Sequence, residues 1–293
     1  MGTVQFGIGA LYATLVWILG WRVKPTLTQT GLIAITKVGL CHSLGQLAAM
    51  ISIGAGTVSF THIVKALEPF FSAIVSGIYF NKWMNWQVYM TLLPVVGGVG
   101  YACLKERSFS WLAFHSAMAS NLAFALRAVL SKVALESSNS SSGGKKGAAV
   151  VIGTNLTPPN VFAMVTWAAF IVSIPMGLYA EGNTFMNLMN DAIESVENKY
   201  HFLRTVIISG LFHYLNNEVM YLALGEVHPV TLAVGNTMKR VFIMVASILV
   251  FRNPISLQAG IGSAIGISGV LLYSLTKQHY ETLEKSNKKH IKK

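Results

Sequence analysis

Charged residues are scarce in this chain. They make up 11% of its 293 residues, against about 25% in a typical soluble domain. Acidic side chains are the rarer sign, with 11 Asp and Glu against 22 Lys and Arg, and 53% of the residues are hydrophobic. Such a composition excludes a soluble fold. Apolar stretches of about 20 residues recur along the whole length and predict a helical protein that crosses the membrane many times.

Other absences narrow the class further. The chain lacks the alternating segments of about 10 residues that are typical of a transmembrane barrel, so we expect no strands. It has two cysteines, Cys41 and Cys103, both inside apolar runs, and they imply neither a disulfide framework nor a metal motif. No nucleophile–base pair, metal cluster or phosphate-binding loop stands out. We therefore expect no enzyme activity, no metal and no cofactor.

The net charge of +11 is consistent with a membrane protein. Much of the excess lies in loops and in the basic tail, residues 278–293, where it can set topology and meet anionic lipid. The expected surroundings are a lipid bilayer, and no nucleic acid is expected as a partner.

One apolar run, Val230 to Phe251, carries Asn236 and the adjacent cations Lys239 and Arg240 near its middle. A charge at membrane depth costs roughly 2.5 to 3.5 kcal/mol on insertion scales. Two such cations persist only when they face a polar cavity or an anion. This run predicts an anion site within the membrane.

The apolar runs predict nine spanning helices. The first ends at the basic turn Arg22 to Pro25, Pro69 is expected to kink the third, and a flexible polar loop is expected at 136–158. The predicted spans are 2–21, 31–53, 58–79, 88–104, 111–135, 161–179, 202–224, 230–251 and 257–275.

An internal repeat links two of these regions. Residues 58–104 and 229–275 share an order of features, with a cation-bearing helix, a short polar turn and then a glycine-rich helix, at an offset of about 171 residues. Lys65 and Lys239 then lie on corresponding helices. The two units are five helices apart, and an odd number of helices per repeat makes the repeats inverted in topology. Two five-helix repeats need ten helices, so one helix is expected to precede residue 1.

Three motifs resemble those of a known family. The runs Val58–Phe71 (VSFTHIVKALEPFF), Gly235–Phe242 (GNTMKRVF) and Cys41–Gly45 (CHSLG) resemble the plastid phosphate translocators of the drug/metabolite transporter superfamily. The resemblance extends over nearly the whole chain in one register. It implies a single transmembrane domain over 1–293, with a first repeat at about 1–107, a second at about 108–277, and nine of the ten helices present.

The resemblance also implies a function and a set of site residues. The family exchanges inorganic phosphate for phosphorylated C3, C5 or C6 compounds, its phosphate clamp falls on Lys65, Lys239 and Arg240, and a substrate-contacting arginine falls on Arg127. Three further site positions depart from the triose-phosphate type. They are occupied by Gln46, Ala49 and Asn216.

Charge supports this assignment. At membrane depth the sequence supplies two carboxylates, Glu68 and Glu218, and four cations, which are Lys65, Arg127, Lys239 and Arg240. The surplus of two positive charges suits a doubly charged phosphate ester. The alternative is that the cations form ion pairs holding the helices together.

We therefore expect a monomeric antiporter in a plastid membrane, the inner envelope, which exchanges phosphate for triose phosphate or 3-phosphoglycerate. Phosphoenolpyruvate or a sugar phosphate is the alternative substrate, given Gln46, Ala49 and Asn216. A nucleotide-sugar carrier of the same superfamily is a more remote alternative, and a non-transporting receptor more remote still.

Overall fold

The computed structural model describes residues 2–104, 109–142, 152–182, 199–226, 229–251 and 256–290, with a few single positions between 184 and 193. Nearly all of these residues are helical, which confirms the all-α membrane class. Within the described residues, five helices are long and apolar enough to cross a membrane. They are Gln29–Ala55, Val58–Phe80 (which is broken, as described below), Trp111–Leu135, Pro158–Tyr179 and Leu257–Leu283.

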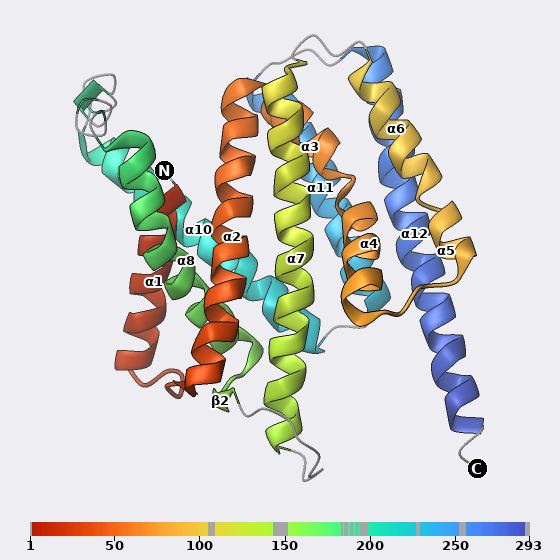
Figure 1. Cartoon of the computed structure of the whole chain (residues 1–293). Helices are drawn as coiled ribbons and strands as arrows, with labels where there is room; N and C mark the ends of the chain where they lie inside the picture. Colours follow the sequence, from red (N-terminus) through yellow and green to blue (C-terminus); the bar gives the residue numbers. More distant parts are fainter. Residues whose placement is uncertain are drawn as a thin grey trace. The chain divides into compact units, whose positions relative to one another are not determined.

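The chain forms two compact units, and neither is continuous in sequence. Unit 1 comprises residues 1–44 and 130–226, and unit 2 comprises 45–129 and 227–293. Each unit therefore takes its helices from both predicted repeats, so the repeats are not the compact units of the fold. The helices α2 (Gln29–Ala55) and α7 (Trp111–Ser142), which Figure 1 labels, each contain residues of both units.

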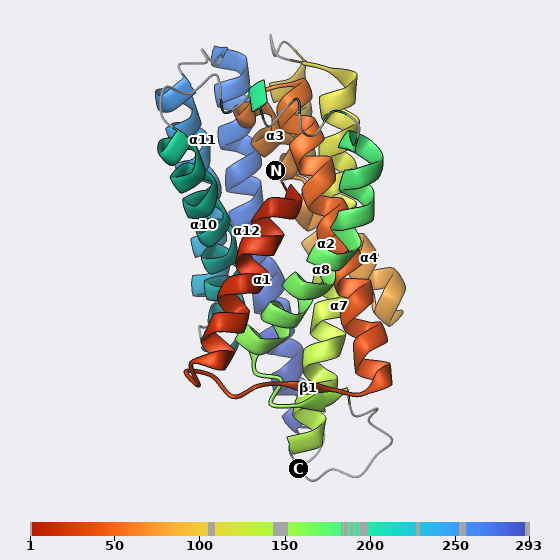
Figure 2. The ribbon, with the colours of Figure 1, turned by 90° about the vertical axis from the view of Figure 1, so that its left-hand side faces the viewer.

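In unit 1, helix α1 (Gly2–Ile18) packs against α8 (Pro158–Glu181) and α10 (Lys199–Glu226), as Figure 2 shows. Close approach of α1 to α10 depends on Gly9, because a Cβ at this position would meet the Tyr214 ring at 2.8 Å. Aromatic side chains fill the centre, where Phe162 contacts both Tyr214 and Tyr221.

Unit 1 also contains a short sheet, so the expectation of no strands is wrong. Strand β1 (Thr26–Leu27) pairs antiparallel with β2 (Gly153–Thr154). Asn160 reinforces the pairing by donating to the carbonyls of Val23 and Asn155. Two-residue strands carry no periodic signal that a sequence pattern could reveal.

In unit 2, the span expected at 58–79 is two helices. Helix α3 (Val58–Lys65) ends at Lys65, and α4 (Glu68–Phe80) begins at Glu68 with Pro69 in its first turn. Proline lacks an N–H donor and fits the start of a helix better than its interior. The kink expected at Pro69 is therefore confirmed, as a break at Ala66 and Leu67 between the end of α3 and the start of α4.

The next span is broken in the same way, which was not expected. It consists of α5 (Trp86–Met90) and α6 (Leu93–Cys103), and Pro94 lies in the first turn of α6. Both breaks in unit 2 thus coincide with a proline that starts a new helix.

Helices α6 and α12 (Leu257–His290) pack backbone to backbone. A Cβ on Gly98 would lie 2.5 Å from the Gly266 nitrogen, and one on Gly262 would lie 2.5 Å from the Gly98 oxygen. A Cβ on Gly269 would likewise meet the Val95 nitrogen at 2.8 Å. We call this contact, made by Gly98, Gly262, Gly266 and Gly269, the glycine seam. Glycine at these four positions allows the two helices to approach closely.

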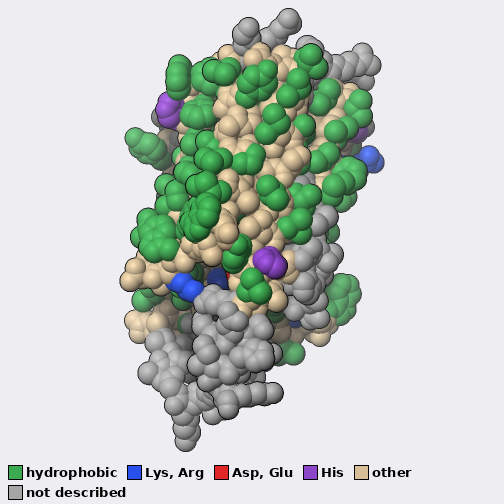
Figure 3. Space-filling view, turned by 90° about the vertical axis from the view of Figure 1, so that its right-hand side faces the viewer, with side chains coloured by type: hydrophobic (Ala, Val, Ile, Leu, Met, Phe, Trp, Pro, Cys, Tyr) green, Lys and Arg blue, Asp and Glu red, His purple; other side chains and the backbone are tan. Residues whose placement is uncertain are grey.

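The outer faces of α6 and α12 are apolar (Figure 3). A surface of this kind suits the hydrocarbon core of a bilayer, where apolar side chains face lipid. The exposed large hydrophobic residues on these two helices are Leu93, Val96, Tyr101, Leu257, Ile261, Ile265, Leu272, Leu275 and Leu283.

Two predicted segments differ from the structure. Helix α7 continues to Ser142, and β2 occupies Gly153–Thr154, so both ends of the predicted 136–158 loop contain regular structure. The predicted basic tail at 278–293 is helical as far as His290, because α12 continues beyond its apolar part. The middle of the loop, 143–151, and the last three residues lie outside the described part of the chain.

Candidate anion-binding site

Lys65 is the last residue of α3, at the break before α4. Irregular backbone at membrane depth is tolerated where it is buried in protein or lines a cavity, and broken helices mark the substrate sites of many transporters. Glu68 begins α4, where a carboxylate interacts favourably with the positive end of the helix dipole. The break therefore supplies both a half-buried lysine and a nearby acidic group.

Phe124 on α7 brings two of the predicted site residues together. The Lys65 Nζ lies 4.4 Å from the centre of the Phe124 ring, and the Arg127 Cζ lies 5.0 Å from it. Each cation is thus within the range of a cation–π contact, which is worth more where water is excluded. Two positive charges held at one aromatic ring form a local excess of charge that suits an anion.

Gly45 makes room for that ring. A Cβ at this position would approach the Phe124 ring to 3.1 Å, which is closer than ordinary packing allows. The last residue of the Cys41–Gly45 motif thus has a physical role at the candidate site, since a larger side chain there would displace Phe124 and with it the contact of both cations.

Lys239 lies on α11 (Pro229–Phe251), a helix that packs against α3. A hydrogen bond of 2.8 Å between the hydroxyls of Ser59 and Ser247 fixes the register of the two helices, which run in opposite directions (Figure 1). Lys65 follows Ser59 along α3, and Lys239 precedes Ser247 along α11. At 1.5 Å per residue the two lysines lie about 9 and 12 Å from that contact, toward the same end of the helix pair.

The remaining predicted site residues are distributed over both units. Half-buried Gln46 and buried Ala49 lie on α2 within unit 2, close in sequence to Gly45. Asn216 lies on α10 in unit 1, with its side chain exposed. Arg240 follows Lys239 on α11, and its side chain lies outside the described part of the chain.

Glu218 changes the charge balance expected from the sequence. Its carboxylate accepts a 2.6 Å hydrogen bond from Arg22 in a salt bridge, and a weaker one of 3.4 Å from the Tyr214 hydroxyl. Arg22 therefore neutralises Glu218 inside unit 1. Of the two carboxylates set against the four predicted site cations, Glu68 then remains, which leaves a larger positive surplus for an anion.

Breaking this salt bridge is expected to destabilise the protein. The Glu218 side chain is 7% exposed, and removing one partner of a buried ion pair typically costs about 3 kcal/mol or more. Arg22→Met should therefore lower the free energy of unfolding by about 3 kcal/mol, as measured by chemical denaturation in detergent. Arg22→Met combined with Glu218→Gln should recover most of the loss, and an equally unstable double variant would contradict this account.

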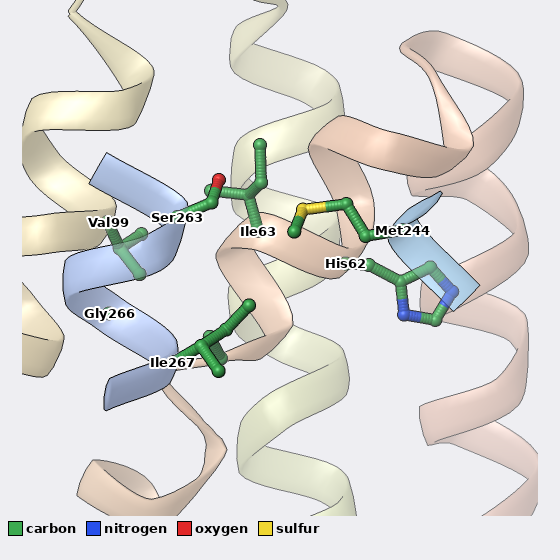
Figure 4. A pocket seen from close by; sticks show the side chains of 8 residues that line it. His62, Ile63, Val99, Met244, Ser263, Gly266 and Ile267 are labelled. Atoms are coloured by element: carbon green, nitrogen blue, oxygen red, sulfur yellow. The ribbon is translucent and has the colours of Figure 1, made fainter. Parts of the chain in front are cut away.

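A small pocket in unit 2 has none of these cations in its lining (Figure 4). Ile63, Met244 and Ile267 line it together with Val99 and Ser263, and His62 is its other polar member. Because the lining is almost wholly apolar, the pocket does not suit a phosphate dianion, whose burial requires cations or hydrogen-bond donors.

Sequence reasoning missed four residues that the structure makes important. They are Ser120, Asn121 and Phe124, which contact α3 or Lys65, and Arg22, the partner of Glu218. Ser120 and Phe124 could have been suspected, since with Arg127 they follow the i, i+4, i+7 spacing of a single helix face. No local pattern connects Arg22 with Glu218.

Comparison with known proteins agrees with the resemblance in the motifs. The Triose-phosphate Transporter family matches residues 1–274. The chain is 37% identical over 282 residues to the chloroplastic triose phosphate/phosphate translocator of Pisum sativum, covering 96% of this chain and 65% of that protein. For the translocator of the same name from Solanum tuberosum the identity is 37% over 290 residues, covering 99% and 65%.

A relative with another substrate in its name is nearly as similar. The chain is 36% identical over 277 residues to the chloroplastic phosphoenolpyruvate/phosphate translocator 1 of Oryza sativa subsp. japonica, covering 94% of this chain and 64% of that protein. The chain thus spans about 65% of the length of the curated relatives that it matches. With helices, motifs and a family match over 1–274, the chain belongs to the Triose-phosphate Transporter family, whose fold is of the drug/metabolite transporter type.

Proposed function

We propose that this chain is an antiporter that exchanges inorganic phosphate for triose phosphate or 3-phosphoglycerate across a plastid membrane, the inner envelope. The observation that carries the proposal is the position of Lys65, at the end of a broken membrane helix and on the same aromatic ring as Arg127. The names of the relatives from pea and potato support the substrate class.

Lys65, Arg127, Lys239 and Arg240 are the proposed phosphate-binding residues. Arginine can form two parallel hydrogen bonds to a phosphate, whereas lysine acts as a compact point charge. The packing of α3 against α11 supports a clamp to which each repeat contributes one lysine. Gln46, Ala49 and Asn216 are proposed to contact the rest of the substrate.

Electrostatics explains why transport would be an exchange. Sealing an empty cavity that holds a surplus of positive charge is costly, since the cations lose hydration when water is excluded. A bound dianion offsets those charges and allows the cavity to close. The carrier then changes its conformation only when loaded, which couples the exit of one phosphate compound to the entry of another.

Counter-exchange in liposomes tests the proposal. Purified protein is expected to take up labelled phosphate at least about 10-fold faster when the liposomes contain phosphate or triose phosphate than when they contain none, because the surplus of positive charge opposes closure of the empty carrier. Equal rates with and without an internal substrate would contradict obligate exchange.

Lys239→Ala should abolish the stimulated uptake, and unchanged uptake would remove Lys239 from the site.

Phosphoenolpyruvate is the second candidate substrate. The relative from Oryza sativa favours it, together with the residues Gln46, Ala49 and Asn216 at positions where the triose-phosphate type differs. The same liposomes, loaded in turn with triose phosphate, 3-phosphoglycerate, phosphoenolpyruvate and glucose 6-phosphate, would rank these compounds by the rate of exchange that each supports.

We further propose that the protein acts as a monomer and has no enzyme activity.

A further inference from the structure

Two adjacent residues of α7 hold the end of α3. The hydroxyl of Ser120 accepts a 2.9 Å hydrogen bond from the Lys65 ammonium, and the Asn121 side chain donates a 3.0 Å hydrogen bond to the Val64 carbonyl. Both α7 residues are fully buried. We infer that Ser120 and Asn121 are positioning residues, which fix the Lys65 ammonium where the proposed site needs it; this inference rests on the proposed phosphate exchange.

The hydrogen bonds of Ser120 have a defined direction. Its Oγ donates its single proton to the Gly45 carbonyl at 2.8 Å. A carbonyl can only accept and a serine hydroxyl has one proton, so the lone pairs of Oγ remain for the Lys65 ammonium. Gly45 on α2, Ser120 on α7 and Lys65 on α3 are thus connected in one chain of hydrogen bonds. Through this chain α2 and α7 together fix the position of the ammonium.

Asn121 acts on the backbone of the break. The last carbonyls of a helix lack their regular partners, and at membrane depth each one has to be satisfied inside the protein. The Val64 carbonyl accepts from the Leu67 N–H at 3.1 Å as well as from Asn121. Within the described part of the chain the Asn121 Oδ1 has no hydrogen-bond partner, so donation to Val64 is the polar contact that its removal would abolish.

Phe124 completes the arrangement. It lies one helical turn after Ser120 on the same face of α7, and its ring contacts the same ammonium. An ammonium has three donors, so its bond to Ser120 does not by itself exclude contact with an anion. Three residues of α7 therefore hold the end of α3: Ser120 bonds to the Lys65 ammonium, Asn121 bonds to the Val64 carbonyl, and the Phe124 ring contacts the same ammonium.

The test is phosphate-for-phosphate exchange by the full chain in liposomes. Ser120→Ala is expected to raise the half-saturating phosphate concentration about 10-fold with little change in maximal rate, since a hydrogen bond to a charged group is lost while the site itself remains. Ser120→Thr keeps the hydroxyl and should restore most of the affinity. Asn121→Ala should also raise the half-saturating concentration, and the double variant should show less than the product of the two effects, because both changes displace one ammonium.

Ser131→Ala is the matched control. Ser131 lies on the same helix, and its hydroxyl bonds to Tyr221 rather than to Lys65. This variant is expected to leave the half-saturating concentration unchanged, and thermal unfolding without phosphate reports any structural cost of each variant. Wild-type affinity in Ser120→Ala, an equal loss in Ser131→Ala, or no rescue by Ser120→Thr would overturn the inference. Wild-type protein that fails to exchange phosphate would instead overturn the proposed function, on which the inference depends.

Discussion

Replacing Lys65 with alanine is expected to reduce phosphate exchange at least about 100-fold, because a charge-assisted hydrogen bond to phosphate and part of the site's positive charge are lost together. The folded protein should persist. Lys65 is half-buried at the end of α3, and the helix break is also held by the hydrogen bond from Asn121 to Val64. The measurement is the initial rate of labelled phosphate uptake into phosphate-loaded liposomes, at matched amounts of folded protein.

Two further variants make this result specific. Lys37 is an exposed lysine of α2. Lys37→Ala removes a positive charge from a membrane helix but leaves Lys65, Arg127 and Phe124 unchanged, so exchange should continue at near the wild-type rate. Lys65→Arg keeps the charge but changes its shape, and we expect an intermediate loss. If Lys65→Ala retained more than about half of the uptake, the break at Lys65 could not be the anion site, since losing one such bond costs about 10-fold or more.

Replacing Gly98 with valine is expected to lower the free energy of unfolding by about 3 kcal/mol, at the upper end of what overpacking usually costs. Even its Cβ would lie 2.5 Å from the Gly266 nitrogen and 2.7 Å from the Gly262 oxygen. These are backbone atoms and cannot turn aside as a flexible side chain could. Helices α6 and α12 would have to separate, and thermal unfolding in detergent would show a lower midpoint.

The neighbouring glycine provides the matched control. Gly97 is exposed, and a Cβ there would have nothing within 4 Å. Gly97→Val changes the same residue type to the same side chain on the same helix, one position away, and should leave the midpoint close to that of the wild type. Equal midpoints for the two variants would show that the glycine seam does not determine the stability of unit 2.

The sequence predicts most of the fold because its signals are local. Apolar runs locate the spans, and Pro69 indicates the break after Lys65, since a proline lacks the backbone N–H donor wherever it lies in a helix. Pro94 is the same signal, and its break was overlooked because the apolar run continues without interruption through it. The strands β1 and β2 were missed because two residues are too few to show alternation.

The site is harder to predict because its contacts are not local. The motifs and the charges pointed to Lys65 and Arg127, and the structure joins them at Phe124. The pairing of Lys65 with Ser120 depends on how α3 meets α7, which no pattern within either helix specifies. Arg22 and Glu218 are separated by 196 positions in the chain, and their pairing was hidden for the same reason.

The glycine seam has a consequence for how this chain can change over generations. Helices α6 and α12 contain the corresponding glycine-rich segments of the two predicted repeats, and each occupies the space that a side chain on the other would need. Copies of a duplicated segment ordinarily drift apart independently. Here a bulkier residue on either helix would clash with the backbone of the other, so neither segment can change along the glycine seam unless the two helices move apart.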